Sequence, residues 1–384
     1  MNQPQTSTHS TFRLAIVHWF PLEQFPPVQN ILEFFGEQSN FQVLCCATER
    51  KGEQFAYRYN KVQLHRTTFP SPNHAKLARL AYFLYFPFST FLKLIFFRPN
   101  SILYIEPHSA PAVFFYSLLF PNCRIFVHYH EYREPKHLFL KGNTLARIGN
   151  WLERIFLFHK TTWISHTNTD RIRLFLNDFP KISSAKLHAL PNMPPKSWLE
   201  SARKVPKESI GKLKLVYIGA ISLHDTYLES LLDWFNRNHQ KGITLDIYIN
   251  NVDPATKSFL SRQRIDGLTV HLGGVPYNQL PFVLPRYDIG LILYRCNTVN
   301  YIYNAPNKLF EYLVCGLNVL FPLQMLGVKP YSRNHIYPWV KSVDFDKLRE
   351  LTVDELRTCD GINKPWDQTC ESIYESLLNE MLNR

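Results

Sequence analysis

The chain has 384 residues, of which 45% are hydrophobic and 15% aromatic, enough for two or three domains that each bury a core. Its 43 Lys and Arg against 31 Asp and Glu favour anionic partners: a phosphate-bearing substrate, an acidic membrane surface or nucleic acid. The basic residues form no long run and match no nucleic-acid-binding module, so we expect no nucleic-acid partner.

Short apolar segments alternate with helical segments through the first half of the chain. Helices are predicted at residues 28–35, 75–97, 110–119 and 144–158, and strands at residues 12–18, 41–46, 101–106, 124–129 and 161–165. Such alternation is typical of a parallel, doubly wound sheet with helices on its faces.

A change in composition at residues 194–212, rich in Pro, Lys and Ser, predicts a linker. The alternation then restarts, with helices at residues 228–237 and from Pro306, and strands at residues 213–219, 245–249, 269–272, 289–294 and 318–321. A last amphipathic helix covers residues 366–382. We therefore predict two doubly wound domains, 12–193 and 213–364, whose strand ends face a central cleft.

The stretch from residue 80 to 97 is the one membrane candidate. It approaches the length of a membrane span, but Pro87 interrupts it and Lys93 lies inside it. Three interpretations stay open: a helix packed on a sheet, an aromatic and basic face at a membrane surface, and a true span. Seven cysteines without metal-ligand spacing, and an N-terminus without a signal-peptide pattern, favour a cytoplasmic location.

The segment from Pro306 to Tyr312 (PNKLFEY) is the most informative motif. Pro306 suits the first turn of a helix, and Gly316 fits a left-handed helix end. Free amides at a helix start attract phosphate, and a cation such as Lys308 is favourable in that turn only beside an anion. Glu311, three residues later on the same face, can accept hydrogen bonds from ribose hydroxyls. The alternative is an ordinary amphipathic helix with an ion pair.

Residues 307–312 followed by Gly316 resemble the "NKLFEY…G.PV" segment of GT-B glycosyltransferases, particularly family 4-like bacterial polysaccharide enzymes. Weaker matches follow in the family's order at residues 190–192, 214–219, 271–275, 288–291 and the final helix. In that family the lysine meets the donor diphosphate and the glutamate binds the ribose. The resemblance therefore implies a donor site whose candidates are Asn307, Lys308, Glu311, Gly219, Tyr303 and Gly274.

The sequence departs from the family pattern at two places near this site. Tyr303 stands where retaining relatives carry a second glutamate, and the loop at residues 220–226 offers only His224 where relatives carry Arg and Lys. The stereochemical outcome of sugar transfer stays open, and diphosphate binding would depend on Lys308 and the helix start.

The acceptor-side candidates follow the strands of the first half. The strand at 124–129 leads into His130 and Glu131, where the family often carries "HEY", and a histidine at a strand's carboxyl end suits acid/base catalysis. Glu131 would orient His130 or act as the base itself. Glu106, His108 and His18 follow or end neighbouring strands and are further acceptor-side candidates. The alternative for His130 is a hydrogen-bonded structural role.

Asp344-Phe345-Asp346 matches the "DxD" pattern of metal-dependent transferases, but it precedes a helical segment, so a helix-capping aspartate is the better interpretation. We predict no metal ion and no cofactor other than the nucleotide sugar itself, UDP- or GDP-linked.

Together these observations predict an α/β, GT-B protein with an acceptor-side domain (12–193), a linker (194–212), a donor domain (213–364) and a terminal helix (365–384) that crosses back to the first domain. The predicted function is transfer of a sugar to a polysaccharide, glycolipid or other glycan acceptor, at the cytoplasmic membrane face through residues 76–98. The alternatives are a GT-B sugar-nucleotide epimerase and a catalytically degenerate GT-B partner subunit.

Overall fold

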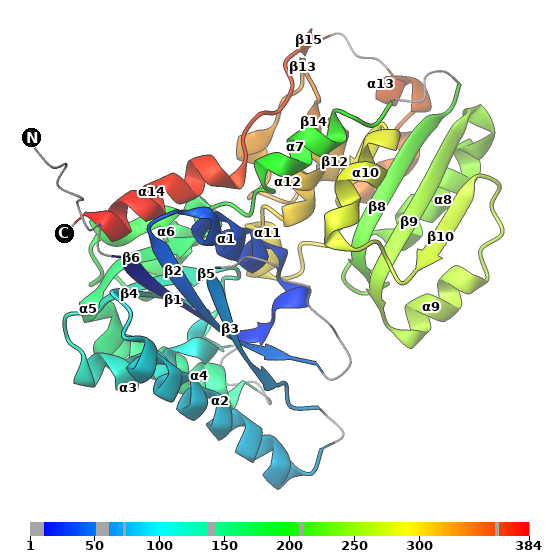
Figure 1. Cartoon of the computed structure of the whole chain (residues 1–384). Coiled ribbons are helices and arrows are strands. Elements are labelled where there is room, and N and C mark those ends of the chain that lie inside the picture. The colour runs from blue at the N-terminus through cyan, green and yellow to red at the C-terminus, as the bar shows by residue number, and fades with distance from the viewer. Residues whose placement is uncertain are drawn as a thin grey trace, which may run out of the picture. The chain divides into compact units, whose positions relative to one another are not determined.

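The computed structural model describes residues 11–50, 61–71, 74–136, 143–206, 211–357 and 361–383 (Figure 1). The chain divides into two compact units. The first unit comprises Met1–Leu190 and Ile373–Arg384, and the second comprises Pro191–Ser372. Each unit is built around its own parallel sheet.

The first unit contains a seven-stranded sheet with the order β3-β2-β1-β4-β5-β6-β7. Its strands are β1 Phe12–Pro21, β2 Phe41–Glu49, β3 Val62–Thr68, β4 Ser101–Ile105, β5 Arg124–Tyr129, β6 Thr161–His166 and β7 Leu187–Ala189. Its helices are α1 Pro26–Glu37, α2 Lys76–Phe97, α3 Ala110–Leu119, α4 Thr144–Leu152, α5 Phe158–Lys160, α6 Thr169–Asp178 and most of α14 Cys370–Leu382, with a π-helical turn, η4, at Glu153–Leu157. Short 3-10 turns are η1 Leu22–Gln24, η2 Pro107–Ser109 and η5 Ser184–Lys186.

The second unit contains a six-stranded sheet with the order β10-β9-β8-β11-β12-β14. Its strands are β8 Leu213–Ile221, β9 Ile243–Val252, β10 Leu268–Leu272, β11 Ile289–Leu291, β12 Asn318–Pro322 and β14 Val340–Val343, with a separate pair β13 Ile336–Tyr337 and β15 Ile362–Asn363. Its helices are α7 Lys196–Ala202, α8 Leu228–Asn238, α9 Pro254–Ser261, α10 Leu280–Val283, α11 Val299–Ile302, α12 Asn307–Val314 and α13 Val353–Arg357. The 3-10 turns are η6 His239–Lys241, η7 Tyr277–Gln279, η8 Leu284–Arg286, η9 Lys329–Tyr331 and η10 Phe345–Glu350.

The predicted α/β architecture with two doubly wound sheets is confirmed, since all paired strands within each large sheet run parallel. Several elements differ from the prediction in extent. The strands β1 and β8 continue to Pro21 and Ile221, β11 stops at Leu291, and α14 begins only at Cys370. A helix, α7, lies within the stretch expected to be a linker.

Among the elements that were not predicted, β3 and α6 lack the expected apolar run. β3 is an edge strand in which most side chains are only half-buried, so polar residues are tolerated along it. The helix α6 presents Arg171 to the interior, and the side chain of Asn168 caps its start by accepting a hydrogen bond from the Arg171 amide.

Each sheet reverses its strand order once. In the first unit the reversal lies between β1 and β4, and in the second between β8 and β11. Ligands of open parallel sheets bind beyond the carboxyl ends of the strands at such a switch point. We therefore expect the functional residues of each unit among those that follow these strand ends.

Candidate active site

Helix α12 begins beside the switch point of the second sheet. Pro306 is extended and forms the N-cap, so the helix starts at Asn307, one residue later than the sequence suggested. Lys308 therefore lies in the first turn, and Glu311 lies one turn further along. At the other end Gly316 takes a positive φ of 77°, which supports the predicted left-handed helix end.

Tyr312 fixes α12 against the sheet. Its hydroxyl accepts a hydrogen bond from the Ile218 amide at 3.2 Å and lies 3.3 Å from the Leu291 carbonyl. Gly290 makes room for the ring, because a Cβ built at this position would lie 2.3 Å from Tyr312. The helix start is thus held at the carboxyl ends of the two strands that flank the switch point.

The Lys308 ammonium is enclosed by aromatic rings. Its Nζ lies 4.1 Å from the centre of the Tyr217 ring and 5.0 Å from that of Tyr294, and the residue is 7% exposed. Among the residues that the structure describes, no hydrogen-bond acceptor reaches Lys308 Nζ. Ring faces attract a cation but do not accept its hydrogen bonds, so the ammonium keeps donors for an anion that is not part of the chain.

Burial weakens the charges of this lysine and its neighbour. Burial lowers the pKa of Lys308 to about 7, against the opposing attraction of Glu311. Burial likewise raises the pKa of Glu311 to about 7, against the attraction of Lys308. An anionic ligand at the helix start would restore the full positive charge of Lys308.

The other donor-side candidates lie at different distances from this lysine. Gly219, with a φ of 121°, is adjacent: a Cβ there would lie 3.1 Å from Lys308 Nζ. Asn307 is its half-buried neighbour on α12. Tyr303 follows α11, with its backbone against Gly327, and Gly274 packs on Asn250 of β9, so neither of these two is shown in contact with Lys308.

Sequence reasoning did not identify the tyrosines around Lys308. Tyr217 lies within β8, Tyr294 follows β11, and Tyr301 of α11 stacks on Tyr294 with ring centres 5.0 Å apart. Their signal in the sequence is an aromatic residue at or after each strand beside the switch point, which is weak on its own.

In the first unit, the loop that carries His130 and Glu131 is held by its backbone. The amides of both residues donate to Glu106 Oε1, at 2.9 and 3.2 Å. The His130 carbonyl accepts a hydrogen bond from Arg171 at 2.5 Å. Glu106 itself has a φ of 64°, a strained backbone for a residue other than glycine, which its surroundings hold in place.

His130 and Glu131 face different environments. His130 is buried among rings, with ring centres 4.6 Å from His128 and 6.5 Å from His18. The side chain of Glu131 is 57% exposed and lies 4.0 Å from Arg133. The two neighbouring side chains therefore lie in different surroundings, one inside the first unit and one at its surface.

Further histidines surround this loop in a neutral form. Burial lowers the pKa of His18 and His128 well below the usual value, and the nearby His130 adds to the effect. Burial also lowers the pKa of His108, to about 3, and its ring packs on Phe20. The candidates His18 and His108 therefore lie with His128 near the carboxyl ends of β1, β4 and β5, as uncharged imidazoles.

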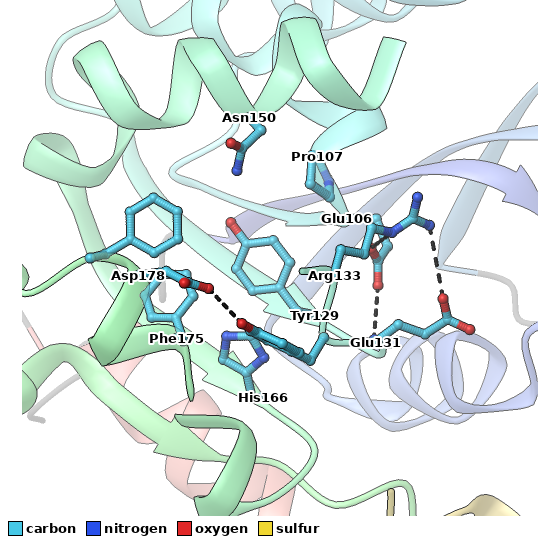
Figure 2. A pocket seen from close by; sticks show the side chains of 11 residues that line it. Glu106, Pro107, Tyr129, Glu131, Arg133, Asn150, His166, Phe175 and Asp178 are labelled. Carbon is cyan, nitrogen blue, oxygen red and sulfur yellow. Dashed lines mark hydrogen bonds and ion pairs between the residues drawn. The ribbon is translucent and has the colours of Figure 1, made fainter. Parts of the chain in front are cut away.

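A small cavity opens beside the loop, and Figure 2 shows Arg133 between the carboxylates of Glu106 and Glu131. Arg133 lies 3.6 Å from Glu106, whose pKa burial nevertheless raises to about 7. The cavity holds about 40 Å³, room for a few water molecules. Sequence reasoning missed Arg133 and Arg171, which orient the loop from positions without a recognisable motif.

The side chain of Asp344 caps η10, accepting a hydrogen bond from the Asp346 amide at 3.1 Å. This is the capping role that the sequence predicted for the "DxD" segment.

No family model and no curated protein sequence matches the chain. Solved structures resemble it over nearly its whole length. The UDP-GlcNAc 2-epimerase of Neisseria meningitidis, bound to UDP-GlcNAc, is 14% identical, with a TM-score of 0.59 over 97% of this chain and 100% of that one. The lipopolysaccharide outer core galactosyltransferase WaaB is 11% identical, with a TM-score of 0.61 over 97% and 100%. OtsA is 11% identical, with a TM-score of 0.63 over 97% and 99%.

The chain has the GT-B fold. This confirms the fold that the sequence resemblance implied. At these identities the likeness establishes the fold alone, and the structures that share it include transferases and epimerases.

Proposed function

We propose that this GT-B protein is a glycosyltransferase, related to family 4 bacterial polysaccharide enzymes, that uses a UDP- or GDP-linked sugar. The observation that carries the proposal is the buried Lys308 ammonium, without an acceptor in the described chain, in the first turn of α12 at a switch point. A donor diphosphate supplies the missing acceptors, and the free amides of the helix start add to its binding.

The donor side has a division of roles. Lys308 binds the diphosphate and stabilises the negative charge that grows on it as the glycosidic bond breaks. Glu311, one turn along the same helix, accepts hydrogen bonds from the ribose hydroxyls. Gly219 leaves space beside Lys308 Nζ for the phosphate oxygens, and Asn307, Tyr303 and Gly274 contribute to the rest of the donor site.

On the acceptor side, we assign acid/base work to His130 and Glu131. Sugar transfer requires a base for the proton of the attacking acceptor hydroxyl. Glu131 presents an exposed carboxylate, while His130 is buried next to neutral imidazoles, and their backbone is fixed by Glu106 and Arg171. His18 and His108 complete the floor of this side.

The acceptor in this proposal is a polysaccharide, glycolipid or other glycan at the cytoplasmic face of a membrane, which residues 76–98 contact. The support is the basic charge of the chain and the apolar helix α2. A second enzymatic function, epimerisation of the donor sugar, is favoured by the likeness to a UDP-GlcNAc 2-epimerase bound to its nucleotide sugar. Product analysis without acceptor separates the two, since only an epimerase then changes the sugar.

Replacement of Glu311 by alanine tests the donor site. We expect calorimetry to show nucleotide-sugar binding weakened about tenfold to a hundredfold, since hydrogen bonds to a buried charged group are lost. Glu311→Gln keeps the shape of the side chain, and its affinity for nucleotide sugar should fall between those of the wild-type protein and Glu311→Ala. The matched control is Glu350→Ala, an exposed glutamate of the same unit. If the wild-type protein binds no nucleotide sugar, or Glu311→Ala binds as tightly, the proposal is wrong, and a partner-subunit role becomes the better interpretation.

A further inference from the structure

The outward face of α2 is apolar along its whole length. Leu77 and Phe96, near its two ends, are each 81% exposed, and Leu84 and Phe88 continue the stripe between them. The opposite stripe, which includes Leu94, is buried in the core of the first unit. The helix therefore has two apolar faces, and the fold uses only one of them.

α2 is long and apolar enough to cross a membrane, by length and composition only. Its position in the fold argues against a span. The helix connects β3 to β4, two strands of one sheet, and its inner face packs on that sheet. A helix that crossed the bilayer here would carry the adjoining sheet into the hydrocarbon, where polar side chains and sheet edges are not tolerated. The exposed face is therefore suited to lie on a membrane.

The exposed apolar face continues onto the neighbouring helices. α3 packs beside α2, and α4 beside α3, on the same side of the first sheet (Figure 1). α3 adds exposed Phe115 and Leu119, and α4 adds Ile148 and Trp151, the latter 58% exposed. We call these exposed side chains of α2, α3 and α4 the three-helix surface. Apolar patches of this kind mark interaction sites.

The charges on these helices have one sign. Lys93 of α2, Arg98 at its end, Arg147 of α4 and Arg154 of the following π-helical turn are exposed. The only carboxylate in α2, α3, α4 and that turn is Glu153, which is fully buried. A second copy of the chain would bring this positive surface against itself, since a two-fold interface pairs the same patch. Anionic lipid headgroups complement it instead.

We propose that the three-helix surface docks on an anionic bilayer, with its apolar side chains among the acyl-chain ends and its basic side chains at the lipid phosphates. This inference deepens the membrane part of the proposed function by naming the surface and the lipid charge. It extends the contact from residues 76–98 to α3 and α4, and it needs no working donor site.

Vesicle binding by the full-length protein tests the proposal. We expect co-sedimentation with vesicles of phosphatidylcholine and phosphatidylglycerol, much weaker co-sedimentation with phosphatidylcholine alone, and release by salt. Trp151 reports the contact directly, because each of the other six tryptophans is buried or half-buried. Its emission should shift to shorter wavelength on binding, and the shift should be lost in Trp151→Phe while sedimentation persists.

Paired variants separate the apolar from the charged contribution. Leu84→Asn with Phe88→Asn should weaken binding at least about tenfold, since apolar area stays in water. Lys93→Gln with Arg147→Gln should weaken it about fivefold per charge removed.

Matched controls carry the same changes on the second unit. Leu272→Asn with Phe282→Asn, and Lys257→Gln with Arg262→Gln, replace exposed residues there and should leave vesicle binding unchanged. Every variant should retain its circular dichroism spectrum and its affinity for nucleotide sugar, which keeps this test independent of the donor site.

Three results would overturn the proposal: no co-sedimentation with either vesicle, equal binding to neutral and anionic vesicles, or equal losses in the surface and control variants. Self-association that the Leu84 and Phe88 changes abolish, without vesicle binding, would assign the surface to a second copy of the chain instead.

Discussion

The two switch points of the molecule differ in the partners that surround their buried charged groups. In the first unit, the buried Glu106 carboxylate accepts two backbone hydrogen bonds and lies near Arg133, and neutral imidazoles surround the loop that it holds. In the second unit, the buried Lys308 ammonium lies over the rings of Tyr217 and Tyr294, and Glu311, one turn along α12, is its oppositely charged neighbour. The first arrangement orients a loop, whereas the second leaves an ammonium without an acceptor in the described chain.

The difference indicates which unit depends on a ligand. A buried ionised group without hydrogen-bond partners is costly, and proteins retain it where a bound partner supplies the compensation. The second unit should therefore respond strongly to anions, while the first should respond to protons.

Acidification should produce the largest contrast between the units. Burial lowers the pKa of His18, His108, His128 and His166 below the usual 6.5, so protons bind these groups only on unfolding. Stability of the first unit is therefore lost as pH falls below about 6.5. Glu106 and Glu153, with pKa values raised to about 7 and about 8, act in the opposite direction above their usual 4.5. The four histidines outnumber these two glutamates, so the net effect of acidification is to destabilise the first unit.

The second unit has the opposite sign in this pH range. Burial raises the pKa of Glu311, so that acidification favours its folded state, and no buried histidine occurs in the described part of this unit. Hydrogen exchange followed by mass spectrometry at pH 7.5 and pH 5 should show lost protection in the peptides of the first unit only. Equal loss of protection in both units, or earlier loss in the second, would contradict the expectation that the buried histidines make the first unit sensitive to acid.

Removal of the Lys308 charge should separate stability from binding. Lys308→Met keeps the length of the side chain and removes a buried charge, so the melting temperature should stay or rise. Nucleotide-sugar affinity should fall about a hundredfold, the loss of charge-assisted hydrogen bonds to a phosphate. Lys341→Met is the matched control, because Lys341 also lies over a ring, that of Trp339 at 4.8 Å. If both variants bind equally well, Lys308 has only a packing role.

The fold and the local geometry of residues 306–316 could be predicted because they rest on local patterns. Buried parallel strands are continuous apolar runs, and residues 306–316 carry a helix start, two charged residues and a left-handed glycine in one segment. The edge strand β3 and the helix α6 could not be read in this way, since their polar side chains are accommodated only by tertiary neighbours. The sequence likewise indicated only α2 as a candidate for membrane contact, and not the surface that α2 forms with α3 and α4.

The surroundings of each candidate residue required the structure. Tyr217 of β8 and Tyr294, which follows β11, enclose Lys308 from segments that are distant in sequence. Arg171 of α6 holds the His130 carbonyl, while Arg133 lies near Glu106 from within the loop itself. No spacing rule connects such residues, because the sheet order alone brings them together. What the sequence provided was the position of the charged groups, and what the fold added was their burial.

A comparison of two glycines should give the smallest effect and the sharpest view of the donor side. Gly219 and Gly211 both have a positive φ, 121° and 134°, so alanine at either position costs about 1–3 kcal/mol of backbone strain. Only at Gly219 does the added methyl meet Lys308 Nζ, at 3.1 Å, while at Gly211 no atom of the described residues lies within 4 Å. Both variants should melt at similarly lowered temperatures, but only Gly219→Ala should also bind nucleotide sugar more weakly, by about tenfold or less. Equal affinity in the two variants would mean that the phosphate does not approach Lys308 from the side of Gly219, and the anion would then have to reach the ammonium from the α12 start alone.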